Sequence, residues 1–504
     1  MMSLTITEVI CFIIARLLLL YYYLTRTFDY WKIRGVKGPK PILIFGNVID
    51  VMRAKISISI FLKNMYDKYK DERMVGIFEK DLPSLILRDP DLIKDVLIKD
   101  FSVFPERPMF SNEKHEPLSE NLFRVKASKW RPLRTKLTSI FTSGRLKNMF
   151  HLLIECSERF ERCMMHIAEK NEPIDCRDLT ARYTTDVIGS CAFGIDINAI
   201  NDETNEFRRM GKKIFRNDYK TYAKELVRKT PWLYNIIGRL FVDKDVEKFF
   251  IKITMDMIHY RKINNIRRHD FIDILMDLKD QEKLADFELT DTLITAQAFV
   301  FFAAGFETSS TTLSNAMYEL AMNHTIQTKL RQEIKEVLEL TDGKITYDCL
   351  KYMKYLDAVF QETLRKYPPV MYLVRGSLTN YTFNGTNVTI SKGTKVFIPI
   401  YAIQHDPSIY SDPEVFDPNR FTPEVIKLRH PMYFLPFGDG PRNCVGLRFA
   451  YLQTKIGLIK ILNNYLIDVC EKTPTPPYPL NMQDVVMLQP TCGIYVKLSP
   501  ITAS

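Results

Sequence analysis

The chain has 504 residues, of which 46% are hydrophobic and 26% charged, and this balance excludes collagen-like, disordered and coiled-coil classes. The net charge of +10 favours an acidic partner, an anionic membrane surface or a nucleic acid. The nine cysteines include no C-x-x-C pair and no zinc-like spacing, so we expect reduced thiols in a protein that faces the cytosol.

An apolar run over residues 9–24 approaches the length needed to cross a bilayer. Glu8 and Arg16 weaken this prediction, because a charge at the centre of a membrane helix costs about 3 kcal/mol. Tyrosines at 21–23 suit the membrane interface, and five basic residues follow: Arg26, Lys32, Arg34, Lys37 and Lys40. The positive-inside rule then places the rest of the chain in the cytoplasm. We predict a retained transmembrane signal-anchor over residues 1–25, with a helix lying in the interface plane as the alternative.

The residues after the anchor predict a hinge and then one large domain. Residues 26–46 are basic and rich in glycine and proline, which predicts a stiff connection. The body, residues 47–504, starts with a strand-like pattern over 74–87, with a turn at Asp81 and Pro83, and a short amphipathic helix over 91–100. Helical periodicity then dominates, over residues 146–169, 179–194, 205–215 and 246–262. Strands return only near residues 381–399 and at the C-terminal end, so the patterns predict a mainly α domain with small β-sheets.

Residues 437–446 combine two glycines, a proline, an arginine and a cysteine, directly before an apolar helical stretch over 447–462. The glycines and the proline predict a tight loop that ends at the start of that helix. The helix dipole, its free N–H groups and the positive charge of Arg442 would favour the thiolate of Cys444, which is a good iron ligand. Two other interpretations are a turn with a buried cysteine and a nucleotide-binding loop. The latter lacks the third glycine of G-x-G-x-x-G, because Asn443 occupies that place.

The same ten residues resemble the haem-binding signature of the cytochrome P-450 family, F-x-x-G-x-R-x-C-x-G, at each defined position. The resemblance implies the cytochrome P-450 fold, a single haem domain that is mainly α with small β-sheets. It implies haem b (iron protoporphyrin IX) as the cofactor, Cys444 as the metal ligand, and Phe437, Arg442 and Gly446 as further cofactor-binding residues. In that family the thiolate pushes electron density onto the iron and favours cleavage of the dioxygen bond.

Glu362 and Arg365 are three positions apart, which puts both side chains on one face of a helix. Alone, the two residues could be any surface ion pair. With Arg420, in the pattern F-x-P-x-R-F, they resemble the structural triad of the family. Asn419 stands where the family usually has glutamate, and this departure is mild because Arg420 is retained.

A long apolar helix is expected over residues 293–322, and a plain interpretation is a buried core helix. Within it, two small residues followed closely by an acid and a hydroxyl resemble the oxygen-activation segment of the family. There the helix opens into a groove that holds dioxygen and water. The resemblance implies that Ala304 and Gly305 form this groove, and that Glu307 and Thr308 are catalytic residues that relay protons to the distal oxygen.

Trp130 and Arg134 match the W-x-x-x-R pattern of the family, with a solvated basic helix as the alternative. The resemblance implies that both contact a haem propionate, together with Arg442 and Arg375, because a guanidinium group binds carboxylates bidentately. Basic residues near these elements are expected to form the face that meets an acidic reductase: Lys126, Lys129, Arg131, Lys136 and Arg448.

Three segments, at residues 101–108, 186–194 and 366–369, resemble insect microsomal enzymes of family six, which belongs to clan three of the superfamily. The resemblance implies a lipophilic xenobiotic substrate such as a plant toxin or an insecticide, with endogenous steroids or hormones as the rival class. The residues expected to contact the substrate are aromatic or aliphatic: Phe110, Phe123, Phe299, Phe302, Ala303, Val374 and Ile494.

The family pattern also implies an NADPH- and reductase-dependent monooxygenase of the endoplasmic reticulum membrane, with its catalytic domain on the cytosolic side. The chain has no dinucleotide fingerprint, so NADPH and flavins belong to a separate cytochrome P-450 reductase. A microsomal b-type cytochrome is a second candidate partner, beside the lipid bilayer and a lipophilic small molecule, and no nucleic acid is expected. Two rival classes remain: a reductase-independent haem-thiolate isomerase or dehydratase, and a catalytically silent lipophile-binding protein.

Overall fold

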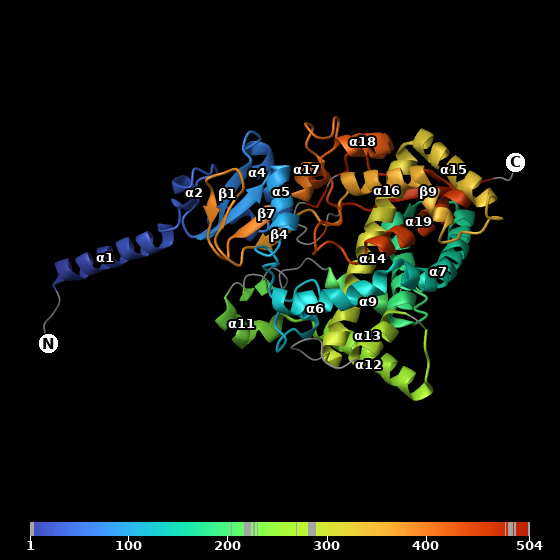
Figure 1. Ribbon diagram of the computed structural model, residues 1–504, viewed down its shortest axis with the longest axis horizontal. Coiled ribbons are helices and arrows are strands. Elements are labelled where there is room, and N and C mark those ends of the chain that lie inside the picture. The colour runs from blue at the N-terminus through green and yellow to red at the C-terminus, as the bar shows by residue number, and fades with distance from the viewer. Residues whose placement is uncertain are drawn as a thin grey trace.

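The computed structural model describes residues 5–501 except 203, 216–222, 225–226, 229, 269, 281–288, 479, 482–486 and 488–489. Figure 1 shows the helix α1 projecting from the body, with β1, β4 and β7 at the end of the body nearest α1 and β9 at the far end beside α15. The α-helices are α1 (Ile6–Thr25), α2 (Tyr30–Ile33), α3 (Ile49–Met52), α4 (Ile58–Lys68), α5 (Pro90–Lys94), α6 (Ala127–Thr138), α7 (Ser143–Lys170), α8 (Cys176–Ile188), α9 (Glu206–Ile214), α11 (Pro231–Ile237), α12 (Lys244–Asn264), α13 (Phe271–Asp280), α14 (Asp291–Met322), α15 (His324–Glu339), α16 (Lys354–Lys366), α17 (Ile400–Gln404), α18 (Pro423–Leu428) and α19 (Leu447–Asn464).

The predicted mainly α fold is confirmed, and the strands of the described residues form three small sheets. The strands are β1 (Met74–Glu79), β2 (Leu82–Leu87), β3 (Ile174–Asp175), β4 (Leu373–Gly376), β5 (Tyr381–Thr382), β6 (Thr389–Ile390), β7 (Lys395–Ile398), β8 (Tyr465–Asp468) and β9 (Tyr495–Pro500). They pair in the orders β1-β2-β7-β4, β3-β9-β8 and β5-β6. The first sheet lies beside α4 and α5 in Figure 1.

The helix α1 is fully exposed and is the one helix of the described residues that is long and apolar enough to cross a membrane. It begins with a capping box, in which Thr5 Oγ1 accepts a hydrogen bond from the Glu8 N–H and the Glu8 carboxylate accepts one from the Thr5 N–H. Glu8 therefore lies at the helix end, where an acid is favourable, and not at its centre. Arg16 stacks on the ring of Phe12 at 4.4 Å. The position of Glu8 thus removes one of the two charges that weaken the prediction of a span, whereas Arg16 stays near the middle of α1.

The hairpin of β1 and β2 differs from the sequence-based expectation at its turn. The turn is made by Lys80, at φ 63°, and Asp81, whereas Pro83 lies inside β2 opposite Phe78. Pro83 is tolerated there because β2 pairs with β7 only from Ser84 onward, so no ladder hydrogen bond is lost at Pro83. The structure also adds β4, which the pattern did not predict as a strand.

The predicted helices are confirmed, with ends fixed by capping groups that the periodicity does not show. The helix α8 starts at Cys176, three residues before the predicted start, because the Asp175 carboxylate accepts hydrogen bonds from the first free N–H groups. It ends at Ile188 in a π-helical turn, η4 (Gly189–Phe193). The helix α14 runs through the middle of the body (Figure 1) and is buried along most of its length, as predicted for a core helix.

Two hydroxyl groups and one glycine fix α8 against α14. Thr184 Oγ1 donates to the Phe306 carbonyl at 2.9 Å, and Thr180 Oγ1 donates to the Ser310 carbonyl at 3.1 Å. A Cβ atom at Gly305 would lie 2.4 Å from Ile188 Cδ1, so only glycine permits this close approach. The contact gives the position of the predicted oxygen-activation segment relative to α8.

Candidate functional site

The loop before α19 is closed by backbone hydrogen bonds and by two glycines in the left-handed region. Gly438 and Gly440 have φ of 65° and 72°, as the predicted tight loop requires. The Cys444 N–H donates to the Phe437 carbonyl at 2.8 Å, which holds the cysteine at the end of the loop. A Cβ atom at Gly440 would lie 1.9 Å from the Leu97 carbonyl oxygen, so the loop is packed directly on the backbone of a neighbouring turn.

The thiol of Cys444 keeps an exposed face, but the dense protein around it raises its pKa through desolvation. A hydrogen bond from the Gly446 backbone N–H and the charges of Arg134 and Arg107 act in the opposite direction. Arg442, which the sequence predicts to add positive charge at the sulfur, is not among these charges. Its Nη2 donates to the Val125 carbonyl at 3.2 Å.

Four arginines from separate segments gather near this loop: Arg107, Arg134, Arg375 and Arg442. Arg375, on β4, and Arg442 are both almost fully buried, and Arg107 Nη2 donates to the Arg442 carbonyl at 2.8 Å. Desolvation, with the nearby charge of Arg442, lowers the pKa of Arg375 to about 10. Desolvation lowers the pKa of Arg442 to about 10 as well, against the carboxylate of Glu106 and with the charge of Arg134. The mutual repulsion indicates a cluster whose positive charge the Glu106 carboxylate compensates only in part.

Nitrogen atoms of this cluster are buried without partners. Arg375 Nε and both Nε and Nη1 of Arg442 have no hydrogen-bond partner within the part of the chain that the structure describes. Among the described residues, no carboxylate forms a salt bridge with any of the four arginines. A buried charge is normally paired and hydrogen-bonded, so the cluster fits a ligand that carries carboxylates. The two propionates of haem match this donor set, with the thiol of Cys444 placed to bind the iron.

Trp130 and Arg134, both predicted to contact a haem propionate, lie at different parts of the site: Trp130 at the arginine cluster and Arg134 at the cysteine loop. Trp130 is buried, and its ring lies 4.4 Å from Cζ of Arg442, so it supports an arginine of the cluster. Arg134 instead donates to Asn443, from Nη1 to the carbonyl and from Nη2 to Oδ1, both at 2.7 Å. Arg107 was not predicted as a site residue. It lies in the segment 101–108 that resembles insect family-six enzymes, but nothing in that segment indicates its contact with Arg442, which only the fold creates.

In the predicted oxygen-activation segment, the acid Glu307 pairs with another helix, whereas the hydroxyl of Thr308 bonds to the backbone of α14 itself. Arg177 Nη2, from the first turn of α8, donates to Glu307 Oε1 at 2.6 Å. Thr308 Oγ1 donates to the Ala304 carbonyl at 2.6 Å. Ala304 is exposed although α14 is a core helix, so α14 has an accessible surface there. Gly305 faces Ile188 instead, and its small size permits the close packing of α14 on α8. The sequence did not indicate that Arg177 contacts Glu307.

The three residues of the predicted triad meet in the structure. Arg365 donates from Nε and Nη2 to the two carboxylate oxygens of Glu362, each at 2.8 Å, and both side chains are fully buried. Arg420 Nε lies 3.6 Å from Glu362 Oε1 and is less deeply buried. The Asp417 N–H also donates to Glu362 Oε1, at 3.0 Å, so the carboxylate joins α16 to the chain before the cysteine loop.

The residues predicted to contact the substrate separate into two groups. Phe302 and Ile494 have no accessible surface, and Phe302 packs against the rings of Phe250 and Phe306. Both residues are part of the packed core here, since aromatic and aliphatic residues fill cores as readily as binding surfaces, and their contact with a substrate stays a prediction. The remaining five are partly or fully accessible: Phe110, Phe123, Phe299, Ala303 and Val374.

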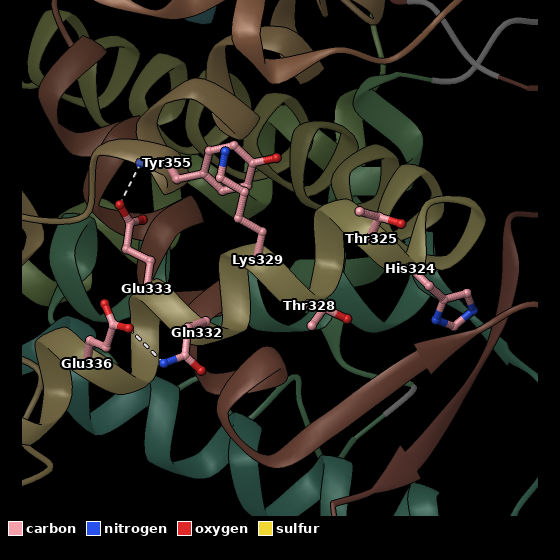
Figure 2. Close-up of a pocket in the computed structure, with 8 residues that line it drawn as sticks. All are labelled: His324, Thr325, Thr328, Lys329, Gln332, Glu333, Glu336 and Tyr355. Atoms are coloured by element: carbon pink, nitrogen blue, oxygen red, sulfur yellow. Dashed lines mark hydrogen bonds between the residues drawn. The ribbon is translucent and has the colours of Figure 1, made fainter.

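A surface hollow elsewhere in the protein contains none of the predicted site residues. Figure 2 shows it on α15, lined by His324, Thr325, Thr328, Lys329, Gln332, Glu333, Glu336 and Tyr355. Its polar groups already serve the fold: Glu333 accepts hydrogen bonds from the N–H groups of Tyr355 and Leu356, at 2.7 and 2.8 Å. Lys329 lies 4.1 Å from the ring centre of Tyr355. We therefore assign no chemistry to this hollow.

These features together are typical of haem-thiolate proteins. The domain is mainly α, its cysteine ends a closed loop beside unpaired arginines, and a nearby helix carries an acid and a hydroxyl. The family model for Cytochrome P450 matches residues 36–497, and the chain belongs to the cytochrome P450 family. It is 42% identical over 462 residues to Probable cytochrome P450 6a13 of Drosophila melanogaster, covering 91% of this chain and 92% of that protein. It is 40% identical to Cytochrome P450 6A1 of Musca domestica, over 90% and 91% of the two chains. It is also 40% identical to Cytochrome P450 6B1 of Papilio polyxenes, over 95% and 97%.

The predicted family and its insect family-six branch are therefore confirmed. Membership implies an oxidoreductase of the monooxygenase type with a haem-thiolate cofactor, and a redox partner that supplies electrons.

Proposed function

We propose that this protein inserts one atom of dioxygen into lipophilic xenobiotics, with electrons that come from NADPH through a separate reductase. The observation that carries the proposal is the cluster of unpaired arginine nitrogens beside Cys444. Cys444 would bind the iron of haem b, while Arg107, Arg375 and Arg442 would hold its propionates. Bound in this way, the haem supplies the binding and reduction of dioxygen.

Electron delivery is proposed to use the basic surface around α6. Lys126 and Arg131 are exposed, and Arg448 at the start of α19 is exposed as well. Lys129 is partly neutralised by Glu120 at 3.2 Å. An acidic face of a flavoprotein reductase would meet these positive charges, which steer association more than they add affinity. Lys136 completes the proposed face, and a microsomal b-type cytochrome would compete for it.

Proton delivery is proposed to use Glu307 and Thr308. Because the Thr308 hydroxyl hydrogen goes to the Ala304 carbonyl, the oxygen keeps its lone pairs for a water molecule on the accessible surface of α14. Glu307 is the neighbouring acid and would resupply that water with protons.

The protein is proposed to sit in the endoplasmic reticulum membrane by α1, with the body on the cytosolic side. The exposed, apolar α1 supports a span, and the basic residues that follow it support the orientation. Residues 1–25 are then the anchor, residues 26–46 the hinge, and residues 47–504 the haem domain.

The substrate is proposed to be a bulky apolar molecule. Phe123 is 43% exposed and its ring lies 4.4 Å below Cζ of Arg107, so an accessible aromatic surface borders the arginine cluster. Phe110, Phe299 and Val374 are further proposed contacts with partly accessible side chains. An endogenous steroid or hormone has the same apolar chemistry, and a substrate screen separates the two classes.

The first experiment is the difference spectrum of the dithionite-reduced, carbon-monoxide-bound protein in membranes. The wild-type protein should give a Soret band near 450 nm, as the family name implies, and Cys444→Ser should lose it. Cys470→Ser is the matched control, because Cys470 is a free and partly buried cysteine outside the loop. A wild-type protein that binds haem without this band would overturn the proposal.

A further inference from the structure

A glutamine buried in α14 binds the backbone of the loop that runs from the short 3₁₀ helix η2 (Pro117–Ser119) to α6. The Leu122 N–H donates to Gln297 Oε1 at 2.8 Å, and Gln297 Nε2 donates to the Glu120 carbonyl at 3.0 Å. Nε2 also donates to the Leu293 carbonyl at 3.0 Å, and Gln297 has no accessible surface. Both donors of this amide are therefore used, and its acceptor and one donor hold two residues of the loop.

The same loop is also bound to the arginine cluster. Phe123, which follows Leu122, has its ring 4.4 Å from Cζ of Arg107, and its carbonyl accepts a hydrogen bond from Arg107 Nη1 at 3.4 Å. The Val125 carbonyl accepts a hydrogen bond from Arg442 Nη2 at 3.2 Å. The loop is thus bound to α14 before Phe123, and to the arginine cluster at Phe123 and after it.

Gln297 lies on the face of α14 that carries Ala304. Seven residues are almost two full turns of a helix, so the two positions share a face and lie about 10 Å apart along the axis. Gln297 is buried under the loop, Val300 is partly accessible, and Ala304 is exposed. The accessible surface of α14 therefore begins where the cover of the loop ends, and the loop borders the space above that surface.

We infer that Gln297 is a positioning residue, which sets the place of Phe123 at the border of the substrate space and thereby determines which apolar ligands fit beside the iron. The inference rests on the proposed function and names a determinant of its specificity. Gln297 itself does not touch the substrate, because it is fully buried. A bulky apolar ligand meets the ring of Phe123, which is 43% exposed, whereas a ligand of a single five-membered ring reaches the iron without that contact.

A purely structural clamp is the alternative, and the chain offers a matched example of one. Gln327 on α15 is buried, its Oε1 accepts a hydrogen bond from the Ile467 N–H, and its Nε2 donates to the Ile467 carbonyl, both at 2.9 Å. This amide joins α15 to β8, and neither element carries a predicted site residue. Loss of either amide leaves buried backbone groups unpaired and lowers stability. Only the loss of Gln297 should also change which ligands the haem accepts.

The test uses Gln297→Met and Gln297→Glu in the full-length protein in membranes, with Gln327→Met as the matched control. Methionine keeps the length of the side chain and loses both functions of the amide. Glutamate keeps an acceptor for the Leu122 N–H and loses the amide donors. Thermal unfolding of Gln297→Met and Gln327→Met shows that the two substitutions disturb the fold to a similar extent.

The probes are imidazole and 4-phenylimidazole, which bind ferric haem through a ring nitrogen and shift its Soret band, so the readout needs no turnover. We expect Gln297→Met to weaken the binding of 4-phenylimidazole about tenfold, because one misplaced apolar contact has an effect of this size. The Kd of imidazole should stay within about twofold of the wild-type value. Gln297→Glu should lie between Gln297→Met and the wild type, and Gln327→Met should leave the ratio of the two Kd values unchanged.

Phe123 supplies a second readout. Phe123→Ala should weaken 4-phenylimidazole as Gln297→Met does, and the double variant should lose no more than either alone, because both remove the same contact. Additive losses would overturn the inference, as would an equal change of the Kd ratio in Gln327→Met.

An unchanged Kd ratio in Gln297→Met, in a preparation with a normal carbon-monoxide band, would overturn the inference and leave the proposed function intact. Where Gln297→Met takes up no haem, Gln297→Glu decides by the same ratio. Absence of the carbon-monoxide band in the wild type would instead overturn the proposed function, and the inference with it.

Discussion

Arg134 donates two hydrogen bonds to Asn443, one to the backbone carbonyl and one to the side-chain oxygen, both at 2.7 Å. The two residues are 309 positions apart, and the contact ties α6 to the residue directly before Cys444. Arg134 thereby controls the shape of the cysteine loop, besides adding positive charge near the sulfur.

Arg134→Gln should loosen this loop. Losing two hydrogen bonds from a charged donor costs about 1.5–3 kcal/mol each at most, so haem retention should weaken clearly. The rate of haem transfer to a scavenger globin measures it. Asn443→Ala keeps the backbone acceptor and should give a smaller increase, and Lys136→Gln, on the same helix, should give none. Equal rates in Arg134→Gln and wild type would contradict the prediction.

Gly440→Ala should abolish haem binding. A Cβ atom would lie 1.9 Å from the Leu97 carbonyl oxygen, which is backbone and cannot move aside, and φ is 72°. Gly438→Ala has the same kind of backbone conformation, but its nearest neighbour is at 3.5 Å, so it should cost only about 1–2 kcal/mol. Carbon-monoxide spectra and thermal unfolding compare the two variants. A normal spectrum for Gly440→Ala would show that the loop is less tightly packed than described.

Glu362→Gln should be far more damaging than Arg420→Gln. It removes the charge that compensates the fully buried Arg365, and breaking a buried ion pair costs about 3–5 kcal/mol. Arg420 is 12% exposed, lies at 3.6 Å and still donates to the Asp412 carbonyl, so its loss should cost about 1 kcal/mol. Urea unfolding of the purified protein gives both values. Similar losses in the two variants would contradict the prediction, because the weaker Arg420 contact would then matter as much as the Glu362 charge.

His405 should make the protein sensitive to acid. Burial, together with the nearby charge of Arg365, lowers the pKa of its imidazole from 6.5 to about 3. The unfolded chain therefore binds a proton below pH 6.5 that the folded protein does not, and stability falls as pH drops from 6.5 toward 3. The slope from this group is about 1.4 kcal/mol per pH unit. His405→Gln should flatten the dependence of unfolding free energy on pH, and identical slopes would exclude His405 as the cause.

Local patterns predicted the parts of the structure that local interactions determine. The 3.6-residue periodicity predicted α7, α12 and α14 within a few residues, and the glycines of residues 437–446 predicted the closed loop. The spacing of Glu362 and Arg365 predicted that both side chains lie on one face of a helix, and they pair on α16, whereas their complete burial was not evident from the spacing.

Long-range contacts lay beyond that reasoning. Arg107 joins Arg442 across 335 positions, and Arg177 joins Glu307 across 130. Neither has a sequence neighbour that indicates its partner. The burial of Phe302 was not predictable for a related reason, since a ring on a helix can face the core or a ligand, and only the packing of neighbouring helices decides which.

The four arginines near Cys444 also have a consequence for how the polypeptide matures. Like charges held together in a poorly hydrated interior oppose the final collapse of the segments that carry them, which come from the chain before α6, α6 itself, β4 and the cysteine loop. A dianionic ligand removes that opposition and stabilises the folded state by mass action. Cofactor supply would then act as a checkpoint in biogenesis: newly made chains that fail to capture it would remain incompletely folded and open to degradation.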